Sequence, residues 1–170
     1  FHLSNKMINS GYNVVGIDNL NNYYDVNLKK DRLKILNEKK QFTFHQINIL
    51  DKSKLFDLLS NYNIKSVIHL AAQAGVKFSL EKPQDYLDNN VTGFLNILEF
   101  CKLHKIPNLL YASSSSIYGA NEMHPFVENH KTEKPISIYG VTKKTNELMA
   151  HTYSHLYKIN TIGLRFFTVY

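Results

Sequence analysis

The chain has 170 residues, of which 44% are hydrophobic, and a formal net charge of +6 at pH 7. It is long enough for one domain, spanning residues 1–170, and apolar enough for a sizeable core. No apolar run approaches membrane-spanning length, and residues 1–7 lack the regions of a signal peptide. The single cysteine, Cys101, excludes an internal disulfide and lies in an apolar helical pattern typical of a buried structural thiol. We therefore expect a soluble, cytoplasmic protein with no membrane partner.

The positive charge would permit binding to nucleic acid or another polyanion. The basic residues are densest in one segment, as Lys29, Lys30, Arg32, Lys34, Lys39 and Lys40. They form no aromatic-interleaved groove or helix-turn-helix pattern, and Leu28, Ile35 and Leu36 give the segment an apolar side. We expect the solvated face of a helix and no nucleic-acid partner, with a polyanion-binding or scaffold domain as the non-enzyme alternative.

The first predicted elements are a helix ended by Ser10 and Gly11 and a short buried strand over residues 13–18. This strand ends in Asp18, whose carboxylate can accept both hydroxyls of an adenosine ribose and would repel a 2′-phosphate. Asp18 and Asn19 could instead form only a turn, but the sheet context favours ribose binding. Because no arginine follows directly, NAD is favoured over NADP.

Three further elements precede the middle of the chain. Residues 42–47 alternate like a strand, and Asp51 can cap the helix that holds Leu55, Leu58 and Leu59. Residues 66–70 are the next buried strand, and small residues follow it at 71–75. Small side chains at the carboxyl end of a strand allow a ligand to approach the backbone closely, although they also suit strand and helix packing.

The second half continues the alternation of strands and helices. A helix is predicted over residues 85–104 with Asn90 among its apolar positions, where a buried amide must find hydrogen-bond partners. A strand at 109–112, a polar loop at 120–137, a helix at 139–157 and a strand at 161–165 follow. Five strands alternating with helices predict the α/β class, a Rossmann-like doubly wound parallel sheet with helices on both faces.

The most informative stretch runs from residue 113 to residue 143. Four serines end the strand at 109–112, and Tyr139 and Lys143 lie four residues apart, on one face of the next helix. Open α/β sheets bind ligands at the carboxyl ends of their strands. An ammonium near a phenol favours the phenolate, so this pair is a candidate general base. His151 and His155 are also four apart, but no clustered acids or cysteines accompany them, and we expect no metal site.

This arrangement resembles the serine and Tyr-x-x-x-Lys site of the extended short-chain dehydrogenase/reductases, the NAD-dependent epimerase/dehydratase family. Four further blocks are similar to its UDP-glucuronate 4-epimerase branch: GIDNLNNYYD at 16–25, HLAAQAGV at 69–76, NELMAHTYSH at 146–155 and LRFFTVY at 164–170. The ordered set is far more specific than Tyr-x-x-x-Lys alone, and it spans essentially the whole chain.

The resemblance implies a nucleotide-sugar 4-epimerase that interconverts UDP-glucuronate and UDP-galacturonate through transient NADH and a 4-keto sugar. Its implied catalytic residues are Ser114, Tyr139 and Lys143. The implied cofactor-binding residues are Asp18, Asn19, Asn48, Ile49, Leu70, Ala71, Ala72, Gln73, Asn90, Ser113, Tyr139, Lys143 and Phe166. The implied substrate-binding residues are Gln73, Lys77, Ser115, Ser116 and Thr168, the last three for the uronate carboxylate.

The alternatives lie mostly within the same enzyme class. Related 4,6-dehydratases place an Asp-Glu pair where this chain has Ser115 and Ser116, so dehydration is disfavoured. UDP-glucose 4-epimerase is the closest alternative, and a UDP-glucuronate decarboxylase is another. The family's first strand and glycine-rich turn, and its carboxyl-terminal substrate region, are not found in this sequence, so we expect a fragment that is inactive alone. The family also implies a homodimer through the two long helices, with Phe100, Met149 and Tyr153 compatible with that interface.

Overall fold

The computed structural model describes residues 1–168, so the last two residues of the LRFFTVY block lie outside the described residues. The chain divides into two compact units, Phe1–Leu55 and Phe56–Tyr170, here called the first and the second unit. Within residues 1–168 each pair of neighbouring strands is parallel, as predicted, but the strands form two separate sheets, of two strands in the first unit and three in the second.

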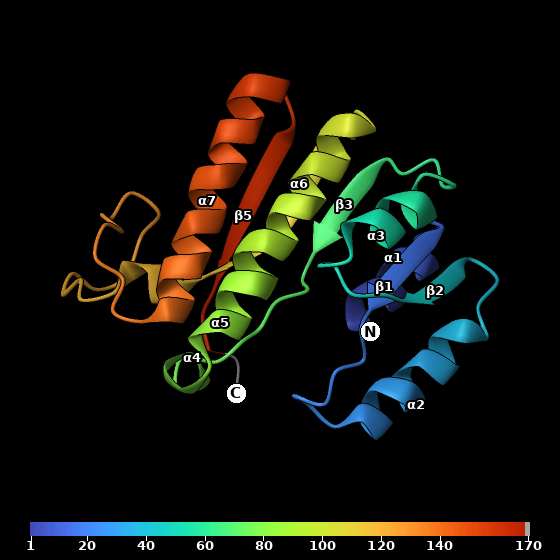
Figure 1. Cartoon of the computed structure of the whole chain (residues 1–170), viewed down its shortest axis with the longest axis horizontal. Helices are drawn as coiled ribbons and strands as arrows, with labels where there is room; N and C mark the ends of the chain where they lie inside the picture. The colour runs from blue at the N-terminus through green and yellow to red at the C-terminus, as the bar shows by residue number, and fades with distance from the viewer. Residues whose placement is uncertain (169–170) are drawn as a thin grey trace. The chain divides into compact units, whose positions relative to one another are not determined.

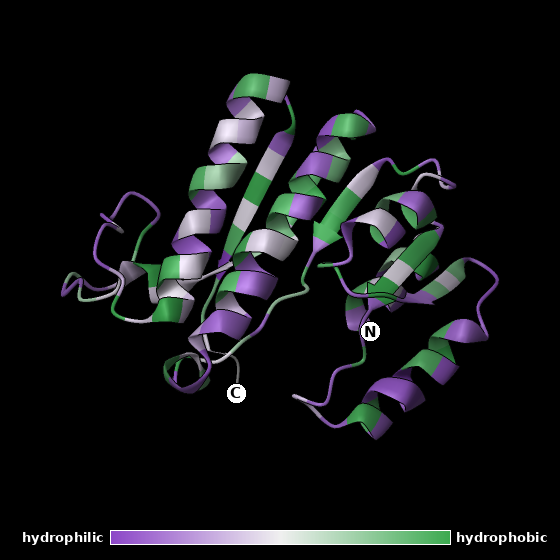
Figure 2. Cartoon of the chain, in the orientation of Figure 1, coloured by the Kyte–Doolittle hydropathy of each residue, from purple (hydrophilic) through white to green (hydrophobic). Residues whose placement is uncertain are grey.

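The first unit is built on two parallel strands. Its elements are α1 (His2–Asn9), β1 (Val14–Asp18), α2 (Val26–Asn37) and β2 (Phe42–Gln46). Val14 is opposite Phe42, and Ile8, Leu36 and Phe42 form a small buried core. The Asp25 carboxylate caps α2 by accepting a hydrogen bond from the Asn27 backbone N–H. Hydrophilic and hydrophobic residues alternate along α2 (Figure 2). Of the predicted apolar side, Leu36 is buried, whereas Leu28 and Ile35 are 49% and 48% exposed.

Helix α3 (Lys52–Leu59) begins before the end of the first unit and continues into the second. The Asp51 carboxylate accepts a hydrogen bond from the Lys54 backbone N–H at 3.2 Å. The predicted cap of this helix is therefore confirmed.

The second unit contains β3 (Ser66–His69), β4 (Asn108–Ser114) and β5 (Asn160–Phe166), in that order across the sheet. Helices α6 (Gly93–Leu103) and α7 (Ile138–Tyr157) lie side by side against this sheet (Figure 1). Leu109, Tyr111 and Ser113 alternate along β4 and are buried. Larger fully buried side chains complete the core: Tyr86, Phe94, Leu98, Phe100 and Ile117.

The predicted helix at 85–104 is divided into three pieces. These are α5 (Pro83–Tyr86), the π-helix η1 (Leu87–Thr92) and α6; the short α4 (Phe78–Glu81) precedes them. The 3₁₀-helix η2 (Ser115–Tyr118) follows β4. π-Helical turns are rare and, where they occur, often lie at functional sites, so η1 indicates that this region is a candidate for the site.

Cys101 is fully buried, and burial raises the pKa of its thiol to about 12, so the prediction of a structural thiol is confirmed. Across residues 1–168 we find no helix with the length and hydropathy needed to cross a bilayer.

Candidate active site

Strand β4 and η2 present the serines. Ser114 ends β4, and its hydroxyl accepts a hydrogen bond from the Ser116 backbone N–H at 3.2 Å and lies 3.2 Å from the Ser116 hydroxyl. A Cβ added at Gly140 would lie 2.7 Å from the Ser116 carbonyl oxygen, so η2 packs tightly on the first turn of α7. Glycine at 140 therefore lets the backbone that carries the serines approach the helix that carries Tyr139.

Helix α7 begins at a serine cap. The Ser137 hydroxyl accepts a hydrogen bond from the Gly140 backbone N–H at 3.0 Å, which fixes the first turn. Lys143 Nζ lies 5.9 Å from the centroid of the Tyr139 ring. The prediction that Tyr139 and Lys143 share one face of this helix is confirmed.

Lys143 is buried, with 2% of its surface exposed. Its ammonium donates a hydrogen bond to the Ala112 carbonyl oxygen of β4 at 2.8 Å. Burial lowers the pKa of Lys143 to about 8. Burial and the positive charge of Lys143 together lower the pKa of the neighbouring His69 to about 3. At neutral pH the lysine is therefore the charged member of this pair, and the histidine is neutral.

Asn90 in η1 joins three segments of the second unit. Its side chain accepts a hydrogen bond from the Gln73 backbone N–H at 2.7 Å and donates to the Gln73 carbonyl at 3.0 Å. It also donates to the Thr142 hydroxyl, which in turn donates to the Tyr139 carbonyl oxygen. Asn146 donates to the Asn90 carbonyl oxygen at 2.6 Å. The prediction that this buried amide finds hydrogen-bond partners is confirmed, and they lie in the loop after β3 and in α7.

The loop after β3 is held from the helix side. The Tyr86 hydroxyl contacts the carbonyl oxygens of Ala74 and Gly75 at 2.5 and 2.6 Å. The Gln73 side chain is 6% exposed, and its Nε2 has no hydrogen-bond partner within residues 1–168. A buried amide nitrogen of this kind normally has an acceptor, so this loop offers a donor that a ligand oxygen could satisfy. Leu70 and Lys77 are exposed, and Ala71 and Ala72 are partly exposed.

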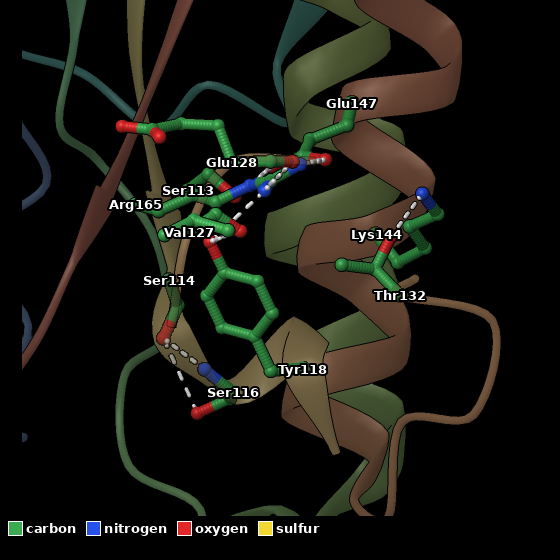
Figure 3. Close-up of polar contacts among 10 residues, drawn as sticks. All are labelled: Ser113, Ser114, Ser116, Tyr118, Val127, Glu128, Thr132, Lys144, Glu147 and Arg165. Carbon is green, nitrogen blue, oxygen red and sulfur yellow. Dashed lines mark hydrogen bonds and ion pairs between the residues drawn. The ribbon is translucent and has the colours of Figure 1, made fainter. Parts of the chain in front are cut away.

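A second polar cluster joins β4, α7 and β5 (Figure 3). Arg165 forms two hydrogen bonds to the Glu147 carboxylate, at 2.9 and 3.0 Å, and the Ser113 hydroxyl donates to the same carboxylate at 2.7 Å. Burial alone would raise the pKa of Glu147, but the hydrogen bonds from Arg165 and Ser113 outweigh it and lower that pKa. The hydroxyl of Ser113, a predicted cofactor-binding residue, is thus engaged within the protein.

Arg165 also holds the polar loop that was predicted at 120–137. Its guanidinium donates to the Tyr118 hydroxyl at 3.0 Å and to the Glu128 carbonyl at 2.9 Å. Lys144 of α7 donates to the Thr132 hydroxyl at 2.6 Å. A cleft of about 450 Å³ lies beside this cluster, lined by Tyr111, Tyr118, Phe126, Glu128, Glu147, Gly163, Leu164, Arg165 and Phe167.

The candidate residues of the first unit lie at or just after the ends of two adjacent parallel strands. Asp18 ends β1, and its carboxylate is exposed and accepts a hydrogen bond from the Leu20 backbone N–H at 2.6 Å. Asn48, just past β2, uses its amide oxygen to accept from the Leu50 N–H. The Asn19 amide oxygen accepts from the Asn21 N–H, and Ile49 is buried. Ile49 therefore contributes packing, while Asp18 presents a carboxylate to solvent.

Glu147 and Arg165 were not predicted to be part of the site. The spacing offered one signal, because Glu147 continues the four-residue series of Tyr139 and Lys143 on α7. Phe166 is half exposed at the end of β5, where it is opposite Ser114 in the sheet register, and Thr168 is exposed just beyond it.

Comparison with known proteins places this chain in a family. Residues 1–170 match the family described as GDP-mannose 4,6 dehydratase. The chain is 50% identical to Protein CapI of Staphylococcus aureus, covering 99% of this chain and 50% of the relative. It is 45% identical to the probable UDP-glucuronate 4-epimerase of Rhizobium meliloti, covering 100% of this chain and 50% of that protein. The chain thus spans about half the length of these curated relatives.

A solved structure agrees with this assignment. The UDP-glucuronic acid 4-epimerase of Bacillus cereus, crystallised with UDP-glucuronic acid and NAD, is 36% identical to this chain. It matches with a TM-score of 0.89 over 99% of this chain and 53% of that one. The predicted Rossmann-like α/β fold class is therefore confirmed. The chain belongs to the family described as GDP-mannose 4,6 dehydratase, and its predicted similarity to the UDP-glucuronate 4-epimerase branch is confirmed.

Proposed function

We propose that this chain carries the catalytic residues of an NAD-dependent nucleotide-sugar 4-epimerase whose substrate pair is UDP-glucuronate and UDP-galacturonate. The observation that carries the proposal is the buried Lys143 beside the Tyr139 ring, next to the strand that ends in Ser114. The names of the relatives and the structural neighbour support the same reaction.

The residues present fit NAD in each unit taken by itself. In the first unit, Asp18 ends a parallel strand with an exposed carboxylate that can accept ribose hydroxyls. In the second, the buried Gln73 Nε2 is a donor with no partner in the described chain. When bound, NAD would accept a hydride from the sugar carbon and return it, which is chemistry that no side chain supplies.

The proton of the 4-hydroxyl would be taken and returned by Tyr139, with Lys143 and Ser114 assisting. With a pKa of about 8, Lys143 is mostly protonated at pH 7, and a nearby cation favours the phenolate form of Tyr139. The phenolate would then take the hydroxyl proton as the sugar is oxidised and return it when the sugar is reduced. Ser114, oriented by the Ser116 N–H, would hydrogen-bond the same sugar oxygen.

The choice of an acidic sugar rests on hydroxyls that follow two neighbouring strands. Ser115 and Ser116 follow β4, and Thr168 follows β5, which pairs with β4 so that Ser114 is opposite Phe166. Hydroxyls and backbone N–H groups at this edge can hydrogen-bond a carboxylate. A dehydratase would need acidic side chains at 115 and 116, and this chain has serines there.

The test uses the full-length protein, incubated with UDP-glucuronate and separately with UDP-glucose, with sugar analysis of the products. We expect UDP-galacturonate from the first substrate and a loss of about a hundredfold or more in kcat for Tyr139→Phe. Tyr153→Phe on the same helix, whose hydroxyl bonds to Glu99, is the matched control and should keep most of the activity. Conversion of UDP-glucose alone would assign the neutral-sugar reaction, and no conversion of either sugar would contradict the proposal.

We further propose that the full-length protein is a homodimer through α6 and α7. Val141, Leu148 and Leu156 share one side of α7 and are 42%, 57% and 58% exposed. Leu95 and Leu103 of α6 are exposed as well, whereas Phe100 is buried and belongs to the core. An exposed apolar helix face of this kind is typical of a protein interface. A monomeric mass by light scattering would contradict the dimer.

A further inference from the structure

Lys29 differs from the other basic residues of α2. Lys29 was predicted to lie on a solvated face, but its side chain is only 21% exposed, and its Nζ lies 3.6 Å from Asp18 Oδ1. Lys30, Arg32 and Lys34 on the same helix are exposed. One cation of this helix is therefore next to the carboxylate at the end of β1.

The position of the Lys29 ammonium is fixed by the turn after β1. It donates to the carbonyl oxygen of Asn21 at 3.1 Å and contacts the Asn21 side-chain oxygen at 3.3 Å. The turn is itself tight, because Leu20 has a φ of 53° and donates its N–H to Asp18. A lysine held by two oxygens loses less freedom on meeting an anion than one free in solvent.

We propose that Lys29 is a second determinant of cofactor choice, acting against Asp18 at the adenosine ribose. The inference rests on the proposed NAD-dependent function. A 2′-phosphate on the ribose would be repelled by the Asp18 carboxylate and attracted by the Lys29 ammonium. The preference for NAD over NADP is then set by the difference between the repulsion of the 2′-phosphate by Asp18 and its attraction to Lys29. Neutralising the carboxylate leaves a cation already in place for a 2′-phosphate.

The experiment measures equilibrium binding of NADH and NADPH to the full-length protein by titration calorimetry. We expect Asp18→Asn to raise the affinity for NADPH relative to NADH by about tenfold or more. The substitution removes the repulsion between the carboxylate and the 2′-phosphate, and the Lys29 ammonium remains as a charged hydrogen-bond partner. Adding Lys29→Met to Asp18→Asn should remove most of that gain. Lys30→Met, which removes an exposed charge one residue away, is the matched control and should leave the gain intact.

The outcomes separate this inference from the proposed function. If the double variant keeps the gain of Asp18→Asn, Lys29 has no role in cofactor choice, although the protein still binds the dinucleotide. If Lys30→Met removes the gain equally, the effect is one of net charge, and the inference is also overturned. If the unaltered protein binds neither NADH nor NADPH, the NAD-dependent function fails and this inference fails with it.

Discussion

Polar side chains are held in different ways in the first and in the second unit. In the first unit they cap backbone N–H groups two residues further on and are exposed, as for Asp18, Asn19, Asn21 and Asp25. In the second unit they join segments far apart in the sequence, as Asn90 does with Gln73 and Thr142. Local caps shape a loop at little cost to stability, whereas buried long-range bonds also determine how helices and strands pack.

The largest effect expected from this comparison is at Asn90. Asn90→Ala would leave buried groups of Gln73 and Thr142 without partners, so we expect a loss of about 3 kcal/mol in the free energy of unfolding. The side chain of the neighbouring Asn89 donates to the Asp85 carbonyl, four residues earlier, so this bond is local and Asn89→Ala should cost less than about 1 kcal/mol. Urea unfolding measures both, and equal losses would contradict the distinction.

A substitution at Lys143 should change the free energy of unfolding in the opposite direction, because burying this charged side chain destabilises the folded state. We expect Lys143→Met to raise the free energy of unfolding at pH 7 by about 1–3 kcal/mol, since a desolvated charge is replaced by an apolar side chain. The same variant should lose epimerase activity. Urea unfolding and the sugar assay measure the two properties, and a large loss of stability would contradict this account.

The difference in stability between Lys143→Met and the unaltered protein should depend on pH, because the pKa of Lys143 is lowered in the folded protein. The folded protein releases this proton near pH 8, and the unfolded chain releases it near the ordinary lysine pKa of 10.5. Between these values the unfolded state binds more protons, so the stability of the unaltered protein rises with pH. The advantage of Lys143→Met should therefore shrink as the pH rises above 8.

Ion pairs test the same difference between the two units, with a smaller expected effect on stability. Arg165 and Glu147 are mostly buried, and Glu147 also accepts a hydrogen bond from Ser113. Lys34 and Asp31 of the first unit are instead 79% and 66% exposed. We expect Glu147→Ala to cost about 1–3 kcal/mol of unfolding free energy and Asp31→Ala less than about 0.5 kcal/mol. Thermal unfolding at pH 7 compares the two variants.

The sign of the pH effect at Glu147 can also be checked. Its pKa is lowered in the folded protein, so its contribution is present above the unfolded value near 4.5 and is lost as the pH falls through the folded pKa. The gap between the unaltered protein and Glu147→Ala should therefore close in acid. A gap that widens below pH 4.5 would contradict this assignment.

Periodicity and punctuation predicted most of the helices and strands, because those signals are local. The alternation at 42–47, the Ser10-Gly11 stop and the Asp51 cap all correspond to observed elements. The π-helix at 87–92 was not predicted, and its Asn90 bonds to Gln73, a residue distant in sequence. The helix at 139–157 was predicted correctly. Val141, Leu148 and Leu156 are apolar positions of its pattern, yet they are exposed, so periodicity alone did not identify the face that packs against the core.

The candidate site was predicted to the extent that it lies on one helix or one strand end. Tyr139 and Lys143 could be paired from their spacing, and Ser114 was implied by the resemblance to the epimerase/dehydratase family. The bonds of Glu147 to Ser113 and Arg165 could not, because they depend on β4, β5 and α7 being neighbours. The same holds for Lys29, whose contact with Asp18 depends on how the turn after β1 folds.

The most direct test of the central claim follows the hydrogen on the sugar carbon. The full-length protein would be given UDP-glucuronate carrying deuterium at C4, and the product would be examined by NMR. Removal and return of a hydride within one site predicts UDP-galacturonate that keeps its deuterium at C4, with no hydrogen entering from the solvent. Loss of the deuterium to water during inversion would contradict the hydride mechanism assigned to the site of Ser114, Tyr139 and Lys143.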